Sequence, residues 1–238
     1  MKNMTPVMRR ELHGYFFSPI AYAVLTIFLF VTGIFFLAVT FAPGAESSLR
    51  RLHELMPLIL VVFLPILTMR LLSEEFRAGT IETLMTAPVG ESDIVLGKFF
   101  GAFIFYVVML ATTLIYAVIV AVFGQIDLGL LFAAYLGLLL LGGLYLAAGL
   151  FFSACTKNQI IAAVCSVVLL MIFTFLAQWI ASTQSGMLSL VFHHLSIVDH
   201  YQDFSRGLID TNHLVFFLTS TALFLFFAVK VLESRRWR

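Results

Sequence analysis

Long apolar runs separated by short polar segments make up most of this chain. A helix of about 20 apolar residues crosses the roughly 30 Å of hydrocarbon in a bilayer with its backbone groups paired internally. Six runs are treated as such spans, at residues 20–40, 56–72, 99–123, 128–154, 160–181 and 214–232. The pattern therefore predicts an all-α integral membrane protein with six transmembrane helices.

Two features of the runs predict how the helices pack. Pro57 and Pro65 lie in the second run, so we expect a kink whose freed backbone groups are covered by neighbouring helices. Small residues four positions apart let helices approach closely in lipid. Such pairs occur at Gly97 and Gly101, Ala133 and Gly137, and Gly143 and Ala147. We expect them in contacts within the bundle or between two copies.

The composition supports a membrane protein. Hydrophobic residues make up 61% of the chain and charged residues 11%, with a mean hydropathy of +1.05, whereas about a quarter of the residues in soluble domains are charged. The formal net charge of +1 leaves no basic excess, which argues against nucleic-acid binding. No segment between the runs is long enough for a core of its own, so residues 1–238 are expected to form one transmembrane domain.

Lysine and arginine residues are distributed unevenly between the two sides of the predicted bundle. Eleven of the 14 fall on the side that holds both termini and residues 74–93. The opposite side has Arg50, Arg51 and Arg206. Because positive residues collect in the cytoplasmic segments of membrane proteins, both termini and residues 74–93 are predicted to face the cytoplasm.

A short amphipathic helix is predicted before the first run. Thr5 is a suitable cap and Pro6 a suitable first helical residue. Arg9, Arg10 and Glu11 carry the charges of this helix, which would lie in the membrane interface. Its apolar side would consist of Val7, Met8, Leu12, Tyr15 and Phe16. A simple positively charged anchor is the alternative.

A charged segment, residues 73–88, separates the second and third runs. Gly79 is expected to end the helix that leaves the second run. Thr80 then caps a new helix with Glu82 in its first turn, and Pro88 ends it. The apolar stripe of this helix consists of Ile81, Leu84 and Met85. A helix this short is unstable alone, which favours insertion into a groove of another protein; a lipid-facing loop helix is the alternative.

The segment from 182 to 212 is too apolar for an ordinary loop and too interrupted to cross the membrane. Ser196 and Asp199 form a pattern like a capping box at the start of a helix. Asp203 and Arg206 lie one turn apart on that helix, where opposite charges interact. Its other side would carry Tyr201, Phe204 and Leu208. We expect two short helices that dip into the outer leaflet.

Few residues offer catalytic chemistry. The middles of the six runs lack Asp, Glu, Lys, Arg and His, which disfavours proton-coupled transport and intramembrane catalysis. The stretch from Gly90 to Lys98 has the wrong spacing for a phosphate-binding loop, so this chain is not expected to bind ATP. Histidines at 193, 194, 200 and 213 with Asp199 match no zinc spacing. We expect them to form hydrogen bonds and not a metal site, with a copper-related role as the alternative.

Polar motifs flank the first, second and last runs. Before the first stand Arg9-Arg10-Glu11-Leu12, Tyr15-Phe16 and Ser18-Pro19; after the second stand Glu74-Glu75, Gly79-Thr80-Ile81-Glu82-Thr83-Leu84 and Pro88. Together they resemble the permease subunits of type-2 ABC exporters. Near the C-terminus stand Asp203-Phe204-Ser205-Arg206-Gly207-Leu208-Ile209-Asp210 and Glu233-Ser234-Arg235-Arg236-Trp237. These residues are similar to the gliding-motility-associated branch of that family, although gliding itself is not implied.

The resemblance implies a non-catalytic, multi-pass subunit of the bacterial inner membrane. It would pair with a second permease copy or paralogue and dock onto two ABC ATPase subunits, which bind the ATP and Mg²⁺, so that this chain holds no cofactor. Some relatives also have an extracytoplasmic accessory subunit. A channel or carrier that works without an ATPase, and a membrane scaffold for assembly, remain the rival functions.

The resemblance also assigns roles to two sets of residues. The cytoplasmic coupling helix and its flank, which contact the ATPase, correspond to Glu74, Glu75, Gly79, Thr80, Ile81, Glu82, Leu84 and Met85. Re-entrant helices between spans five and six, near the outer exit, contain Asp199, Asp203, Arg206, Gly207 and Asp210. No substrate follows from the resemblance.

Overall fold

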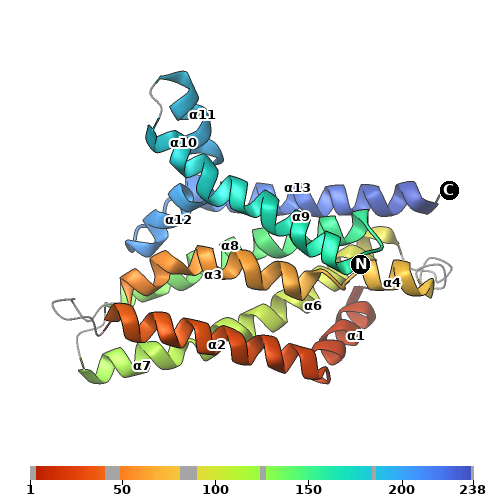
Figure 1. The fold of residues 1–238 in the computed structure, drawn as a ribbon, viewed down its shortest axis with the longest axis horizontal. Helices are drawn as coiled ribbons and strands as arrows, with labels where there is room; N and C mark the ends of the chain where they lie inside the picture. The colour runs from red at the N-terminus through yellow and green to blue at the C-terminus, as the bar shows by residue number, and fades with distance from the viewer. Residues whose placement is uncertain (1–3, 41–48, 81–89, 124–126, 184–185, 237–238) are drawn as a thin grey trace.

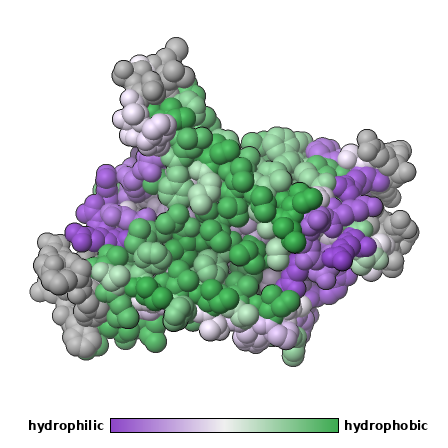
Figure 2. All heavy atoms as spheres, viewed as in Figure 1, coloured by the Kyte–Doolittle hydropathy of each residue, from purple (hydrophilic) through white to green (hydrophobic). Residues whose placement is uncertain are grey.

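The computed structural model describes most of the chain, namely residues 4–40, 49–80, 90–123, 127–183 and 186–236. Within these residues every regular element is a helix (Figure 1). Six of the resulting rods are long and apolar enough to cross a membrane, and an apolar band separates two more polar ends of the molecule (Figure 2). The predicted all-α protein with six transmembrane helices is therefore confirmed.

The helices, in chain order, are α1 (Met4–Phe16), α2 (Pro19–Thr40), α3 (Arg50–Thr68), α4 (Ser73–Ala78), α6 (Glu91–Thr112), α7 (Leu114–Phe123), α8 (Leu128–Cys155), α9 (Gln159–Met171), the π-helical turn η1 (Ile172–Leu176), α10 (Ala177–Thr183), α11 (Met187–Leu195), α12 (Ile197–Ser205) and α13 (Thr211–Arg236). The six spans are α2, α3 with α4, α6 with α7, α8, α9 with η1 and α10, and α13. Helices α1 and α4 lie at one end of the bundle, called here the α4 end, and α12 lies at the other, the α12 end (Figure 1).

The second span differs most from its predicted bounds of 56–72. Its helix already begins at Arg50, because the polar first turn closes an ion pair between Arg50 Nε and Glu54 Oε1 at 3.1 Å. Such pairs at i and i+4 stabilise a helix outside the apolar run. At the far end, α4 stops at Ala78 and Gly79 adopts a left-handed φ of 74°, which confirms the predicted helix end.

Helix α8 is the centre of the bundle and packs against α3, α6, α9, α12 and α13. Glycines along α8 make these close contacts possible. A Cβ at Gly142 would overlap the ring of Tyr106, and a Cβ at Gly149 would overlap Thr68. Gly137 similarly receives Phe204, whose Cβ would lie 2.5 Å from an added Cβ. Contacts of this kind replace the hydrophobic effect as the packing force between helices in lipid.

Pro57 and Pro65 lie inside α3, which continues through both as one helix; the predicted covering of a freed backbone group by a neighbouring helix is seen at Pro57. Pro57 has no N–H to offer the carbonyl of His53, four residues earlier. The hydroxyl of Tyr201, on α12, donates to that carbonyl at 2.9 Å. Burial raises the pKa of Tyr201, so the phenol keeps the proton that it donates. This contact fixes α12 against the first turns of α3.

A second interruption, between α3 and α4, was not predicted. The hydroxyl of Ser153 on α8 accepts from the backbone N–H groups of Leu72 and Ser73 at 3.0 and 3.1 Å, and donates to the carbonyl of Met69 at 3.0 Å. The hydroxyl of Tyr15 on α1 donates to the carbonyl of Leu67 at 2.9 Å. Side chains from two other helices thus satisfy the groups freed at the break.

Alanine substitutions at two neighbouring glycines of α8 test the close packing between α8 and α6. Gly142→Ala should lower the free energy of unfolding by about 1–3 kcal/mol, since the new methyl group must displace the fully buried Tyr106. Gly143→Ala is the matched control, because its Cβ would lie at an ordinary 3.5 Å from Phe103, and alanine favours the helix. Thermal unfolding of the purified protein in lipid nanodiscs measures both. Equal stability of the two variants would contradict the close approach at Gly142.

Candidate functional site

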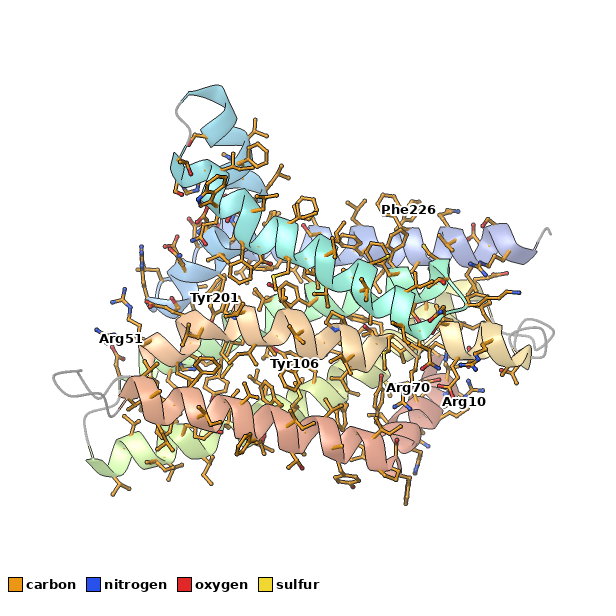
Figure 3. All side chains as sticks on the ribbon, in the orientation of Figure 1. Arg10, Arg51, Arg70, Tyr106, Tyr201 and Phe226 are labelled. Carbon is orange, nitrogen blue, oxygen red and sulfur yellow. The ribbon has the colours of Figure 1, made fainter. Side chains whose placement is uncertain are left out.

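Four charged side chains from three helices meet at the α4 end. They are Arg10 and Glu11 of α1, Glu75 of α4 and Lys98 of α6. The Lys98 Nζ atom lies 2.7 Å from Glu11 Oε1 and 2.9 Å from Glu75 Oε1. Arg10 Nη2 lies 2.5 Å from Glu75 Oε1 and 3.5 Å from Glu11 Oε1. We call this network the charged cluster; Figure 3 labels Arg10 in it.

The charged cluster is electrically balanced and partly removed from solvent. The side chain of Lys98 is only 1% exposed, and those of Glu11 and Glu75 are 17% and 15% exposed. Two cations face two carboxylates, so the formal charges cancel. A buried ammonium group persists only when it is paired in this way. The cluster therefore fixes the relative positions of α1, α4 and α6.

Two glycines bring α1 close enough to α6 for these contacts. A Cβ at Gly97 would lie 2.9 Å from Val7 Cβ, and a Cβ at Gly101 would lie 2.8 Å from Glu11 Cβ. The small-residue pair predicted for bundle or dimer contacts thus lies beneath α1 of the same chain. Lys98, between the two glycines in sequence, reaches Glu11 because the helices approach so closely.

Helix α1 forms as predicted but differs from the prediction in where it begins and in packing along another helix of the bundle. It begins at Met4, so Thr5 lies inside the helix and does not precede it. Val7 and Tyr15 are buried, whereas Arg9, Arg10 and His13 are exposed. Helix α1 packs along α6, which makes it a part of the bundle and more than a positively charged anchor.

Helix α4 is short but contacts several neighbours. Beyond the ion pairs of Glu75, its Phe76 is buried beneath the guanidinium of Arg235 from α13, 4.3 Å from the ring centroid. Arg235 also donates to the carbonyl of Cys155 at 2.6 Å. Together with the Ser153 contacts described above, these interactions tie the six residues of α4 to α1, α6, α8 and α13.

A small cavity of about 160 Å³ lies beside the charged cluster. Its wall includes Glu74 and Arg70, together with Tyr15 and Ser18; Figure 3 labels Arg70. Burial is the main cause that raises the pKa of Tyr15, which keeps its hydroxyl protonated as the donor to Leu67. Although Glu74 and Glu75 are adjacent in sequence, Glu74 lines this cavity and Glu75 belongs to the charged cluster.

The structure places part of the predicted coupling element. Glu75 is in the charged cluster, Glu74 lines the cavity, and Gly79 ends α4. Thr80 is the last residue described before the gap, and Ile81, Glu82, Leu84 and Met85 lie outside the described residues. Lys98 was missed as a partner of Glu11 and Glu75. The sequence did hold a hint of this role, because Lys98 is a lone cation between Gly97 and Gly101 at the start of an apolar run.

The segment before the last span forms the two predicted short helices, α11 and α12. Ser196 Oγ accepts from the backbone N–H of Asp199 at 3.3 Å, which confirms the predicted cap. Arg206 Nη1 lies 3.9 Å from Asp203 Oδ1. Of the remaining predicted residues, Gly207 has a left-handed φ of 86°, and Asp210 Oδ1 accepts from the N–H of Asn212 at 2.9 Å.

One prediction for α12 is wrong. Tyr201 and Phe204 are buried as expected, but Leu208 is 61% exposed. The helix ends at Ser205, and the turn at Gly207 directs the chain away before Leu208 can join the buried side. Among the described residues, no group of three or more His, Cys, Asp or Glu side chains is arranged to hold a metal ion.

Comparison with known proteins gives one family match. The model for the ABC-2 family transporter protein matches residues 53–233, which is well over half of the chain and includes α4, Lys98 and all of α8. No curated protein matches the chain.

The charged cluster can be tested by removing its buried cation. Lys98→Met should lower the free energy of unfolding by up to about 3–5 kcal/mol, because it removes the buried cation and leaves Glu11 and Glu75 with the exposed Arg10. The matched control is Lys230→Met, which breaks an exposed pair with Glu233 and should cost at most about 1 kcal/mol. Unfolding of both variants in nanodiscs supplies the comparison. Equal losses would show that the cluster does not fix these helices.

Proposed function

We propose that this chain, which belongs to the ABC-2 transporter family and is thus a membrane-spanning permease subunit of an ABC transporter, couples ATP hydrolysis by a partner ATPase to movement of its helices. The coupling element would be the segment after Gly79, with Thr80, Ile81, Glu82, Leu84 and Met85 seated in a groove of the ATPase. ATP and Mg²⁺ would be bound by that partner, and this chain would take no catalytic part.

The attachment of α4 is the observation that carries this proposal. A force on residues 80–86 reaches the membrane helices through α4, which immediately precedes them. The ion pairs of Glu75 connect α4 to α1 and α6, and Ser153 connects it to α8. Because α8 contacts most of the other spans, a displacement of α4 would move the bundle as one body and would not be absorbed by a loose linker.

The uneven burial of the spans supports assembly with a second permease copy or paralogue. In the most apolar windows of the α2 and α9–α10 spans 28% of the residues are buried, and in that of α13 only 11%, compared with 61% for α3–α4 and α8. The exposed apolar faces suit lipid and another permease. Side chains such as Val164, Val168 and Trp179 are more than half exposed along the α9–α10 span.

The membrane orientation follows from the same proposal. The α4 end would face the cytoplasm with both termini, since the ATPase is a soluble cytoplasmic protein, and the α12 end would face outward. We place the chain in the bacterial inner membrane and, from its C-terminal motifs, in the gliding-motility-associated branch of the family. An extracytoplasmic accessory subunit would then contact the α12 end.

Docking can be tested with a charge on the apolar stripe of the coupling element. Leu84→Asp should reduce co-purification of the ATPase from native membranes more than tenfold, because burying an unpaired carboxylate costs several kcal/mol. Membrane insertion should be unchanged. Leu208→Asp, at an exposed position of the α12 end, is the matched control and should retain the ATPase. Undiminished ATPase recovery and hydrolysis with Leu84→Asp would refute the docking role.

A further inference from the structure

Three hydrogen bonds run in series through two histidine rings at the α12 end. His213 Nε2 lies 2.8 Å from Asp203 Oδ2. His213 Nδ1 lies 2.7 Å from His200 Nδ1. His200 Nε2 in turn lies 3.2 Å from the carbonyl oxygen of His194. The series thus joins α11, α12 and α13, and neither the coupling element nor the charged cluster takes part in it.

The two end groups of the series, the His194 carbonyl and the Asp203 carboxylate, determine how many protons it must contain. A carbonyl oxygen only accepts, so His200 Nε2 must carry hydrogen, and a neutral imidazole then has a bare Nδ1. A carboxylate also only accepts, so the same holds for His213 with Asp203. Two neutral rings would therefore direct two lone pairs at each other across 2.7 Å. Three hydrogen bonds require three protons, and two neutral imidazoles supply two.

We propose that His200 and His213 form a proton-binding site that holds one additional proton between their Nδ1 atoms and thereby fastens α12 to α13. Asp203 supplies the compensating charge, so that the series is neutral when the proton is bound. The short distance selects a proton over a metal ion, because two nitrogens on tetrahedral zinc lie about 3.3 Å apart at ordinary Zn–N lengths.

The surroundings of the two rings favour a single shared proton. His200 stacks on Phe216 with 3.9 Å between ring centroids, and the His213 side chain is 16% exposed. Burial is the largest cause and lowers the pKa of His200; the hydrogen bond to the His194 carbonyl raises it, and the nearby His213 lowers it. His200 is accordingly the acceptor of the shared proton, and Asp203 Oδ2 lies on the far side of His213, 2.8 Å from its Nε2 atom.

Other charged groups near the pair are few. On α11, His193 contacts Asp199 at 3.0 Å, and the Asp199 charge partly opposes the lowering of the His200 pKa. Arg206 follows α12 and lies near Asp203. The α3 residue Glu54 influences Tyr201 and not the pair, and α10 contributes no ionisable side chain. All these α11 and α12 groups line a cavity of about 810 Å³, through which the site exchanges protons.

The bond between the rings exists only while the pair holds one proton. A second proton would place two cations against each other, and loss of the first would leave two opposed lone pairs. The lowered pKa of His200 means that the folded state resists a second proton while the unfolded chain accepts it at its ordinary pKa of about 6.5. The stability that the bond contributes is therefore greatest near this pH. It is lost as the pH falls and the unfolded chain takes up the second proton, and it is lost again as the pH rises far enough for the pair to release its first.

The experiment is nitrogen NMR on the full chain with ¹⁵N-labelled histidine in lipid bilayers at pH 7.5. An isolated imidazole is only about one-tenth protonated there, whereas the wild-type protein should show one imidazolium ring and a coupling between two Nδ1 atoms across a hydrogen bond. His213→Gln and Asp203→Asn should each abolish the imidazolium signal. His193→Gln, which lies outside the series, should retain it.

Two results would overturn the proposal. One is a wild-type spectrum at pH 7.5 in which every histidine is neutral, which needs no variant to fold. The other is an imidazolium signal that survives both His213→Gln and Asp203→Asn. A second measurement is the unfolding temperature between pH 6.5 and pH 5.5. It should fall more in the wild-type protein than in His200→Gln, and an equal fall in both would also contradict the site.

Discussion

Backbone groups that lie in hydrocarbon have no water to bond, and this constraint decides much of the structure. Helix α3 loses a ladder hydrogen bond at Pro57 and ends at Thr68, yet backbone groups freed at both places are paired. The Tyr201 hydroxyl bonds the carbonyl freed by Pro57, and the hydroxyls of Tyr15 and Ser153 bond backbone groups freed between α3 and α4. Because these partners come from α12, α1 and α8, the interruptions connect parts of the chain that are distant in sequence.

The same requirement applied to charge explains the α4 end. Lys98 is almost fully buried and needs carboxylates, which it takes from Glu11 on α1 and Glu75 on α4. A pairing that satisfies electrostatics thereby holds three helices in one arrangement. Helix α4, which precedes residues 80–86, is for this reason held firmly to the bundle, and the coupling element proposed above would need such an attachment on its membrane side.

Features that depend on local sequence could be predicted, and those that depend on helix crossings could not. Run length and apolarity predicted six spans, and the conformational freedom of Gly79 predicted the end of α4. The partners of Lys98 escaped prediction, because Glu11 lies 87 positions away and reaches it only where α1 crosses Gly97 and Gly101. The insertion of the segment after Gly79 into a groove of the ATPase stays a prediction, because residues 81–89 lie outside the described residues. Leu208 was misplaced because the turn at Gly207 was read as a continuing helix.

The contact between Arg235 and Phe76 carries a consequence for biogenesis. The ribosome makes α4 before α13, so the guanidinium that covers Phe76 arrives only after the helices between them, α6 to α12, have been synthesised. Until then Phe76 lacks its cover from α13. The order of translation therefore completes the contacts of α4 late, and the proposed docking element would gain its full support only after α13 has been added.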